Sequence, residues 1–169
     1  MTGAKPDENI RRPMQWSGGE NAGFSGGRPW RQPDAGYIEA NVAAQTDDSA
    51  SLLWHYRALI ALRNQHAALR VGDFHLVSAD NPAIFASLRV SQDEAILVVV
   101  NLAAAPVTDY RLSLKNSRLE AGRYLILMLM GEIPSANLEV NGSGGFADFT
   151  MAEIPSYGTF VIQLQSSSQ

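Results

Sequence analysis

The sequence predicts a mainly β protein, in which an antiparallel sandwich or barrel follows one helix and a long irregular arm. Three observations support this fold class. Segments after residue 72 are short, rich in β-branched residues and separated by turn residues. One segment near residues 48–65 repeats its apolar side chains with helical spacing. Residues 1–46 show no sustained period at all.

The arm, residues 1–46, holds four prolines and two glycine pairs. It also holds six large apolar side chains: Met14, Trp16, Phe24, Trp30, Tyr37 and Ile38. A solvated tail would contain fewer large apolar groups. We therefore expect a long loop that packs against a surface, and irregular segments of this length are usually functional when they are ordered.

The helix is predicted at about 48–65. Asp47–Ser49 offers capping oxygens and negative charge at its start, and Asn64 offers a stop. Its apolar positions include Leu52, Leu53, Tyr56, Leu59 and Ile60. Because Trp54 and Leu62 flank this stripe, it is wider than a helix covering one small sheet needs.

The β region is expected from 72 to 165, and the polar residues 166–169 are expected to fray. Its segments are 74–78, 84–90, 95–101, 107–114, 123–130, 138–140, 146–151 and 159–164. Eight short strands at regular spacing are typical of an antiparallel sandwich or barrel. Residues 95–101 are almost wholly apolar, which predicts a strand buried on both faces.

The composition excludes several classes of function. A formal net charge of -4 disfavours binding to nucleic acid, which needs a basic face. No apolar run approaches the roughly 18 residues of a membrane helix, so we expect no membrane partner. The first residues lack a signal-peptide stretch, which leaves the compartment open. With no cysteine, the chain offers no thiol catalysis and no iron–sulfur site.

Residues that could hold a metal or transfer protons do not form productive patterns. His55 and His66 are about three helical turns apart, too far to share a metal, so we expect no metal site and no cofactor. The adjacent carboxylates Asp7–Glu8, Asp47–Asp48 and Asp93–Glu94 fall in turns or at caps, where they are normally solvated. Spacing and composition therefore indicate no catalytic residue.

The arm does gather side chains of the kind that bind sugars, within Ile10–Ser17, Asn21–Ser25 and Pro29–Trp30. Guanidinium and amide groups donate to hydroxyls, and indole faces pack against ring C–H groups. The same aromatic residues could instead only anchor a long loop to a core. Residue types alone leave both interpretations open.

These segments resemble the loop after the eighth barrel strand of family 13 glycoside hydrolases, the α-amylase superfamily. The motifs that carry the resemblance are, in order, Arg11–Trp16, Asn21–Ser25, Pro29–Trp30, Asn41–Gln45, Ser51–Leu53, Tyr56–Arg57 and Leu59–Arg63. They are similar to motifs of the α-amylase, α-glucosidase and trehalose synthase branches. Arg12 and Ala67 stand where Thr and Pro are common, and we predict no chemical role for either position.

The resemblance implies that residues 1–71 are the end of a catalytic (β/α)8 barrel, namely its last loop and its last helix, about 48–65. It implies that 72–165 form the Greek-key β-sandwich that is called domain C in this family. The family's nucleophile, acid/base and third carboxylate come from earlier barrel strands. We therefore expect them upstream of this chain, with no catalytic residue in it.

The resemblance also assigns candidate substrate-binding residues. Arg11 matches an arginine that, in several such enzymes, helps enclose the sugar on the non-reducing side of the cleavage point. Trp16 and Phe24 are weaker candidates, because both could be loop anchors. Loops after barrel strands carry the active site in (β/α)8 enzymes, which fits all three positions.

The implied function is that of a non-catalytic C-terminal part that supports or shields the barrel of an α-glucosidic hydrolase with a retaining mechanism. The implied partners are the barrel of its own parent chain and, in the parent, an α-glucan or maltooligosaccharide. Two alternatives remain: a carbohydrate-binding or structural accessory module, and a parent of the trehalose synthase type. An exposed barrel-facing surface is expected to favour self-association.

Overall fold

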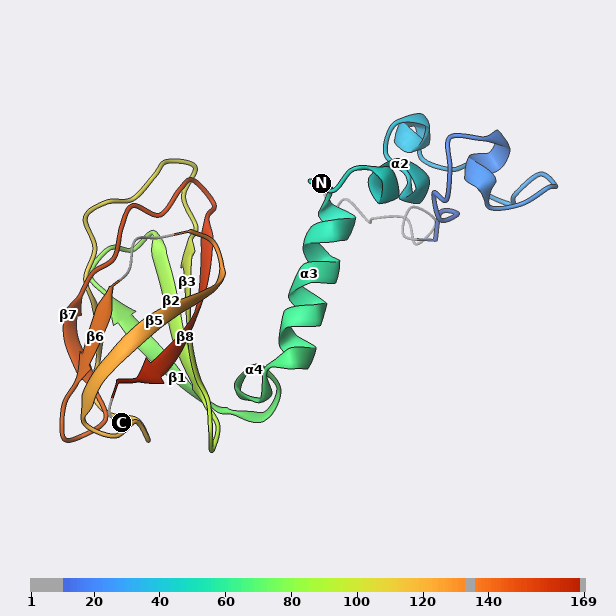
Figure 1. The fold of residues 1–169 in the computed structure, drawn as a ribbon. Helices are drawn as coiled ribbons and strands as arrows, with labels where there is room; N and C mark the ends of the chain where they lie inside the picture. The colour runs from blue at the N-terminus through green and yellow to red at the C-terminus, as the bar shows by residue number, and fades with distance from the viewer. Residues whose placement is uncertain (1–10, 133–135, 168–169) are drawn as a thin grey trace, which may run out of the picture. The chain divides into compact units, whose positions relative to one another are not determined.

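The computed structural model describes residues 11–132 and 136–167, and the chain forms two compact units, Met1–Ala61 and Leu62–Gln169 (Figure 1). The division falls inside the longest helix. The first unit holds the arm and most of that helix, and the second holds every strand found in the described residues.

The arm is more ordered than its sequence predicts. It contains two 3-10 turns, η1 (Glu20–Gly23) and η2 (Ala35–Ile38), and a short helix, α2 (Val42–Asp47). A further short helix, α4 (Ala67–Val71), lies in the second unit. The expectation of one helix and an irregular arm is thus corrected, because side-chain caps organise short helical turns that are too brief to show a period.

The long helix, α3, runs from Leu52 to Gln65 and so begins later than the predicted residue 48. Ser51 acts as its cap: its carbonyl accepts from His55 N at 3.0 Å and its Oγ accepts from Trp54 N at 3.4 Å. Asp48 instead turns the chain before the helix, since its Oδ1 accepts from Ala50 N at 2.9 Å. No residue of α3 is buried in the structure, and Leu52 and Ile60 expose 64% and 58% of their surface.

The described residues of the second unit form eight strands. They are β1 (Asp73–Ala79), β2 (Ile84–Val90), β3 (Ala95–Asn101), β4 (Leu112–Leu114), β5 (Gly122–Met130), β6 (Asn137–Val140), β7 (Phe146–Phe149) and β8 (Thr159–Ser166). All pairs are antiparallel, in the order β6-β5-β8-β3-β2-β1-β4-β7. The hairpins β1–β2–β3, with β4 returning beside β1, form a Greek key. The predicted fold class, a mainly β antiparallel Greek-key domain, is confirmed.

Two predicted strands are shorter than their sequence suggested. Within 107–114 only Leu112–Leu114 is a strand, and Val107 makes an isolated bridge to Ile154. Within 146–151 the strand ends at Phe149, and Asp148 inside it has a left-handed φ of 52° where the register between β4 and β7 shifts.

The core of the second unit lies between its strands. Leu88, Leu97 and Ile162 are fully buried in it, together with Phe146 and Phe149 from β7. The prediction for residues 95–101 is confirmed: Leu97 belongs to this main cluster, whereas Ile96 belongs to a second cluster with Ala68 of α4 and Val161 of β8.

The chain end does not fray where expected. Ser166, at the end of β8, pairs with Tyr124 of β5. The backbone N–H and the hydroxyl of Ser167 both donate to Arg123 O. Residues 168–169 lie outside the described residues, as do residues 1–10 of the predicted arm.

Candidate functional site

The arm is built around one short extended segment, Gln15–Ser17. The amides of Trp16 and Ser17 both donate to Ala22 O, at 2.9 and 3.0 Å. The carbonyls of Gln15 and Trp16 accept from Val42 N and Ala43 N, at 2.9 and 3.0 Å. The amides of Val42 and Ala43 belong to the first turn of α2, where helical N–H groups have no partner within the helix. The segment is thus fixed between η1 and the start of α2.

The turn η1 is left-handed. Asn21, Ala22 and Gly23 have φ values of 50°, 59° and 66°. Such a conformation costs a non-glycine residue about 1–2 kcal/mol. Asn21 compensates by donating from Nδ2 to Ser25 O at 3.1 Å and Gly27 O at 3.3 Å. A Cβ at Gly23 would lie 2.5 Å from Ser17 Oγ, so the turn also needs a glycine for space.

Asn41 connects η2 to α2. Its side chain is buried, its Oδ1 accepts from Ala44 N at 2.9 Å, and its Nδ2 donates to Tyr37 O at 2.9 Å and Ile38 O at 3.3 Å. It is therefore the N-cap of α2 and a clamp on the preceding turn at the same time.

Gln45 and Ser51 join α2 to α3 in a similar way. Ser51 Oγ donates to Gln45 O at 2.7 Å, and Leu53 N donates to Gln45 Oε1 at 3.0 Å. The indole of Trp54 adds a bond from Nε1 to Thr46 O at 2.9 Å. Several of the motif residues found in the sequence therefore serve to hold the arm in shape.

The candidate substrate-binding residues all lie on this frame. Arg11 is exposed at the start of the described arm. Trp16 and Phe24 each expose 51% of their surface, so half of each side chain is available to a ligand or a partner. Neither the Trp16 nor the Phe24 side chain lines the hollow described next.

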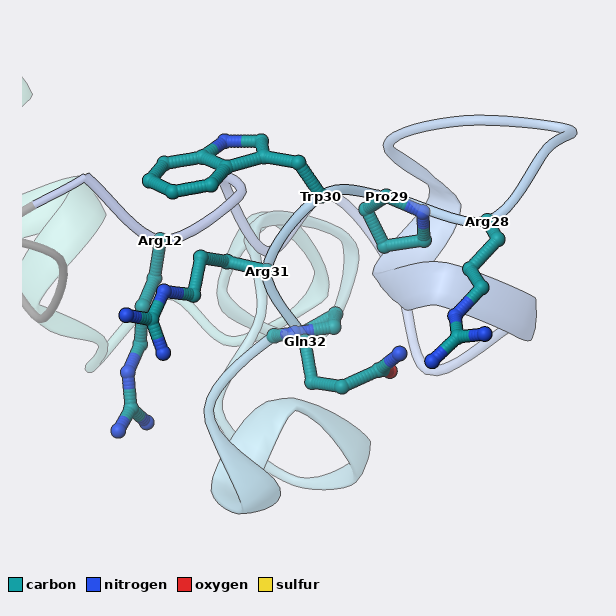
Figure 2. Close-up of a pocket in the computed structure, with 7 residues that line it drawn as sticks. Arg12, Arg28, Pro29, Trp30, Arg31 and Gln32 are labelled. Carbon is teal, nitrogen blue, oxygen red and sulfur yellow. The ribbon is translucent and has the colours of Figure 1, made fainter.

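A hollow of about 290 Å³ lies on the arm and is lined by Arg12, Arg28, Pro29, Trp30, Arg31, Gln32 and Pro33. Figure 2 shows Arg12 and Arg31 extending on one side of it and Arg28 on the other, with the Gln32 amide reaching toward Arg28. Three guanidinium groups, an indole and an amide thus share one small space.

Sequence reasoning missed most of this hollow. It noted Trp30 within a motif but treated Arg12 as a substitution without a chemical role. The sequence offered one signal for it, the local charge. Residues 11–34 contain four arginines and two acidic residues, whereas the whole chain has a net charge of -4.

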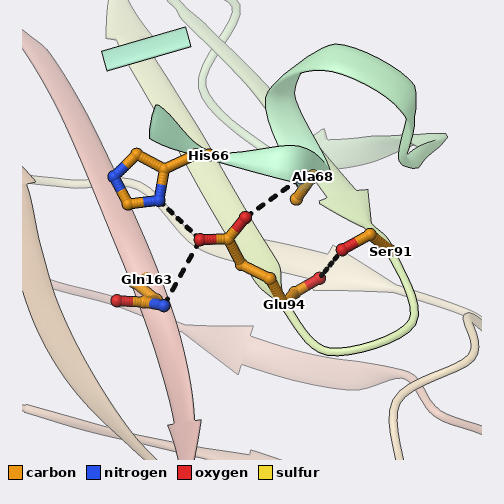
Figure 3. Close-up of polar contacts among 5 residues, drawn as sticks. All are labelled: His66, Ala68, Ser91, Glu94 and Gln163. Carbon is orange, nitrogen blue, oxygen red and sulfur yellow. Dashed lines mark hydrogen bonds and ion pairs between the residues drawn. The ribbon is translucent and has the colours of Figure 1, made fainter. Parts of the chain in front are cut away.

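In the second unit, His66 and Glu94 form a half-buried pair of titratable side chains. His66 Nδ1 lies 2.5 Å from Glu94 Oε1, and Ala68 N donates to Glu94 Oε2 at 3.0 Å (Figure 3). Gln163 Nε2 also approaches Glu94 Oε1, at 3.4 Å. Both carboxylate oxygens are occupied, so this group fastens the start of α4 to the β2–β3 turn and offers no open ligand position.

Over residues 11–132 and 136–167, no group of three or more His, Asp or Glu side chains is arranged to hold a metal ion. In the same described part of the chain, no helix has both the length and the apolar character needed to cross a bilayer.

Comparison with known proteins finds similar sequences. The sequence profile of the alpha amylase catalytic domain matches residues 1–72. An oligo-1,6-glucosidase from Halalkalibacterium halodurans is 39% identical over 107 residues, which are 63% of this chain and 19% of that protein. A trehalose-6-phosphate hydrolase from Escherichia coli is 38% identical over 100 residues, 59% of this chain and 18% of that protein.

Solved structures agree with these relatives. A trehalose-6-phosphate hydrolase from Bacillus licheniformis matches 96% of this chain and 27% of its own, with a TM-score of 0.70 and 28% identity. A trehalulose synthase from Pseudomonas mesoacidophila matches 94% of this chain and 26% of its own, with a TM-score of 0.66 and 28% identity. The chain thus spans about a fifth of the length of these curated relatives and about a quarter of these solved chains.

Proposed function

Because the chain belongs to the α-amylase family of glycoside hydrolases, and its strands form the C-terminal β domain of that superfamily, we propose that it is the C-terminal part of an enzyme acting on α-glucosidic bonds. The parent enzyme would use the retaining route, in which one carboxylate attacks the sugar and another transfers the proton. Its substrates would be starch-type oligosaccharides.

One observation carries this proposal: the family match ends at residue 72, and β1 begins at Asp73. Residues 1–71 would be the last loop and last helix of the catalytic (β/α)8 barrel. Residues 72–165 would be the separate β domain, which supports or shields that barrel. The exposed apolar side chains of α3, among them Leu52, Tyr56 and Ile60, fit a helix whose partner is the rest of the barrel.

In this proposal the chain alone is not catalytic. The acidic residues of the first unit support this, because two of them serve local structure: Asp34 Oδ1 accepts from Gly36 N at 3.1 Å, and Asp48 Oδ1 accepts from Ala50 N at 2.9 Å. The catalytic carboxylates would come from barrel strands outside this sequence.

The test is an activity assay of the 169-residue chain on isomaltose, maltooligosaccharides and a nitrophenyl α-glucoside. We expect no turnover above a protein-free blank. Turnover that disappears when an acidic residue of the arm is replaced would contradict the proposal, because it would place a catalytic carboxylate in this chain.

Arg11 would contact the sugar in the parent enzyme, with Trp16 and Phe24 as weaker contacts. Their exposure supports this role. In the parent enzyme, Arg11→Lys should raise KM, since lysine keeps the charge but loses the forked donor. An unchanged KM would leave Arg11 as a structural residue.

Two other functions remain open. The likeness to a trehalulose synthase favours a parent that transfers or isomerises glucosyl groups, and a product analysis of the parent enzyme separates this from hydrolysis. The chain could also be a carbohydrate-binding accessory module. Titration with maltoheptaose, followed by tryptophan fluorescence, tests binding: no change up to millimolar sugar would leave only the structural role.

The proposal also predicts self-association through the exposed apolar side chains of α3. Solution scattering over a concentration series should show dimers or larger species. A compact monomer at every concentration would contradict this part of the proposal.

A further inference from the structure

The turn between β6 and β7 contains the only Asn–Gly pair of the sequence, Asn141–Gly142. Both residues are exposed. A Cβ added at Gly142 would meet no atom within 4 Å, whereas a Cβ at Gly144 or Gly145 would overlap backbone oxygens. Packing in the turn therefore requires the two later glycines and leaves open space around Gly142.

The side-chain oxygen of Asn141 is held by backbone donors. Its Oδ1 accepts from Ser143 N at 2.9 Å and from Gly145 N at 3.1 Å. The hydroxyl of Ser143 lies 2.6 Å from the same oxygen and 2.8 Å from Lys115 O, so its one proton can serve either acceptor. Two amides directed at one carbonyl oxygen stabilise negative charge that develops on it.

Two nitrogen atoms of the Asn141–Gly142 pair are not held in this way. Among the described residues, Asn141 Nδ2 and Gly142 N donate to no acceptor. The buried residues Asn41 and Asn101, by contrast, both donate from Nδ2 to backbone carbonyls. At Asn141 the turn thus leaves unbound the backbone nitrogen that follows the side chain, and also the nitrogen that would leave on cleavage of the amide.

We propose that Asn141 is a site of spontaneous deamidation. Gly142 N attacks Cγ of Asn141 and gives up its proton, and negative charge forms on Oδ1, where the two amides stabilise it. The bond between Cγ and Nδ2 then breaks and releases ammonia, which takes up the proton. Water opens the resulting five-membered imide at either carbonyl and leaves aspartate or isoaspartate. One water is consumed for each ammonia released, and the modification does not depend on glycosidase activity.

The two products differ in their effect on the turn. Aspartate keeps an oxygen for both amides and changes the net charge of the chain from -4 to -5. Isoaspartate routes the backbone through the side chain of residue 141, and so takes the carbonyl that accepts from Gly144 N at 2.9 Å out of the chain. Because Ser117 Oγ donates to Gly144 O, isoaspartate should also loosen the contact between this turn and the segment between β4 and β5.

Peptide mass spectrometry of the full 169-residue chain, sampled during incubation at pH 8, measures the rate at each asparagine. We expect Asn141 to react about tenfold or more faster than any other asparagine, since glycine leaves the backbone angles needed for ring closure accessible. Asn116 is the internal control, because it is exposed and is followed by Ser117. An Asn141 that stays unmodified, or that reacts no faster than Asn116, would overturn the proposal.

Two variants separate the attack by Gly142 from a general change in the turn. Gly142→Ala fits the open space and should slow the reaction about tenfold or more, because a Cβ restricts the backbone angles that ring closure needs. Ser143→Ala keeps the Asn–Gly pair and both amides, and should change the rate less than about twofold. Circular dichroism shows whether each variant keeps the fold. Equal slowing in both variants would contradict attack by Gly142 N.

Unfolding tests the role of the two amides. In urea at the same pH, the chain keeps the Asn–Gly pair and loses the donors to Oδ1. We expect Asn141 to react at least as fast in the folded chain as in the unfolded chain, because only the folded turn stabilises the charge on Oδ1. A folded chain that reacts tenfold more slowly would show that these hydrogen bonds protect Asn141, and would overturn the role assigned to them.

Discussion

The two units of the chain are stabilised by different interactions. In the second unit, a continuous cluster of buried apolar side chains joins β1 to β8. In the described part of the first unit, Ala22 is the only fully buried residue among the hydrophobic ones. Its shape depends instead on hydrogen bonds from side chains such as Asn41 and Gln45 to the backbone.

This difference follows from how apolar area is arranged. Alternating strands place one face of each strand in a common core, and each buried apolar side chain contributes about 1.5–3 kcal/mol. An arm that turns every few residues cannot align its apolar side chains, so Trp16, Phe24 and Trp30 stay exposed. The second unit is therefore expected to be independently stable, and the first to be sensitive to the loss of single polar groups.

The largest effect is expected from a core cavity in the second unit. Leu97 is fully buried in β3, and Leu97→Ala should lower the free energy of unfolding by about 2–5 kcal/mol. Urea denaturation, followed by the circular dichroism of the β region, measures this loss. Leu127→Ala in β5 is the matched control, because Leu127 is 45% exposed. Equal losses in both variants would contradict the assignment of the core.

The next effect should appear in the first unit alone. Asn41→Ala removes the N-cap of α2 and both bonds to the preceding turn, and should destabilise the arm by about 1–3 kcal/mol. Hydrogen exchange of the Val42 and Ala43 amides should accelerate, while exchange in β3 stays the same. Asn41→Asp keeps the oxygen that accepts from Ala44 N and should lower the stability of the arm less than Asn41→Ala does. Faster exchange in β3 would show that the two units are coupled.

A smaller effect is predicted for the pH dependence of the second unit. Burial raises the pKa of Tyr110 to about 12, and burial also raises the pKa of Tyr124. Unfolded tyrosine has a pKa of about 10, so the unfolded chain loses these protons first as the pH rises. The contribution of the two tyrosines to the free energy of unfolding should therefore be fully present below pH 10 and be lost as the pH rises toward 12.

Tyr110→Phe tests the source of this pH dependence. It removes the hydrogen bond from the Tyr110 hydroxyl to Ala152 O, at 3.0 Å, and should cost about 1 kcal/mol at pH 7. It should also make the alkaline loss shallower than in the unchanged protein, as read from denaturation midpoints between pH 8 and 12. An equally steep loss would place its source elsewhere.

The smallest effect concerns one strained turn. Tyr157 has a φ of 54°, in the left-handed region, and its side chain is 67% exposed. Tyr157→Gly should relieve the strain and raise the thermal midpoint slightly, by the equivalent of up to about 1 kcal/mol. Tyr157→Ala keeps the Cβ and should give no such gain. A destabilised glycine variant would show that the Tyr157 side chain makes a contact worth more than the strain.

Sequence reasoning predicted best where many residues repeat one simple pattern. The strands β1, β2, β3 and β8 were placed within two residues at every end, because apolar or alternating runs of this length between turn residues are a strong signal. It failed for short elements: α2 has six residues, and its cap at Asn41 acts through contacts with Tyr37 and Ile38 that have no periodic signature.

Sequence reasoning likewise identified one part of the candidate site and missed another. The motifs Arg11–Trp16 and Asn21–Ser25 were recognisable as ordered strings, and they resembled the family that the comparisons then supported. The hollow at Trp30 was not recognisable, because Arg12 reaches it from a separate segment and is oriented there by Asp34. An ion pair between two distant segments cannot be recognised from the sequence of either segment alone.

The sequence by itself determined the fold class and the order of the strands, since these depend on local periodicity. Only the tertiary structure decided which strands are neighbours, where β4 and β7 end, and which arginines share a space. Those features depend on contacts between residues distant in the chain, such as the 22-residue separation of Arg12 and Asp34. A local pattern carries no information about partners at that distance.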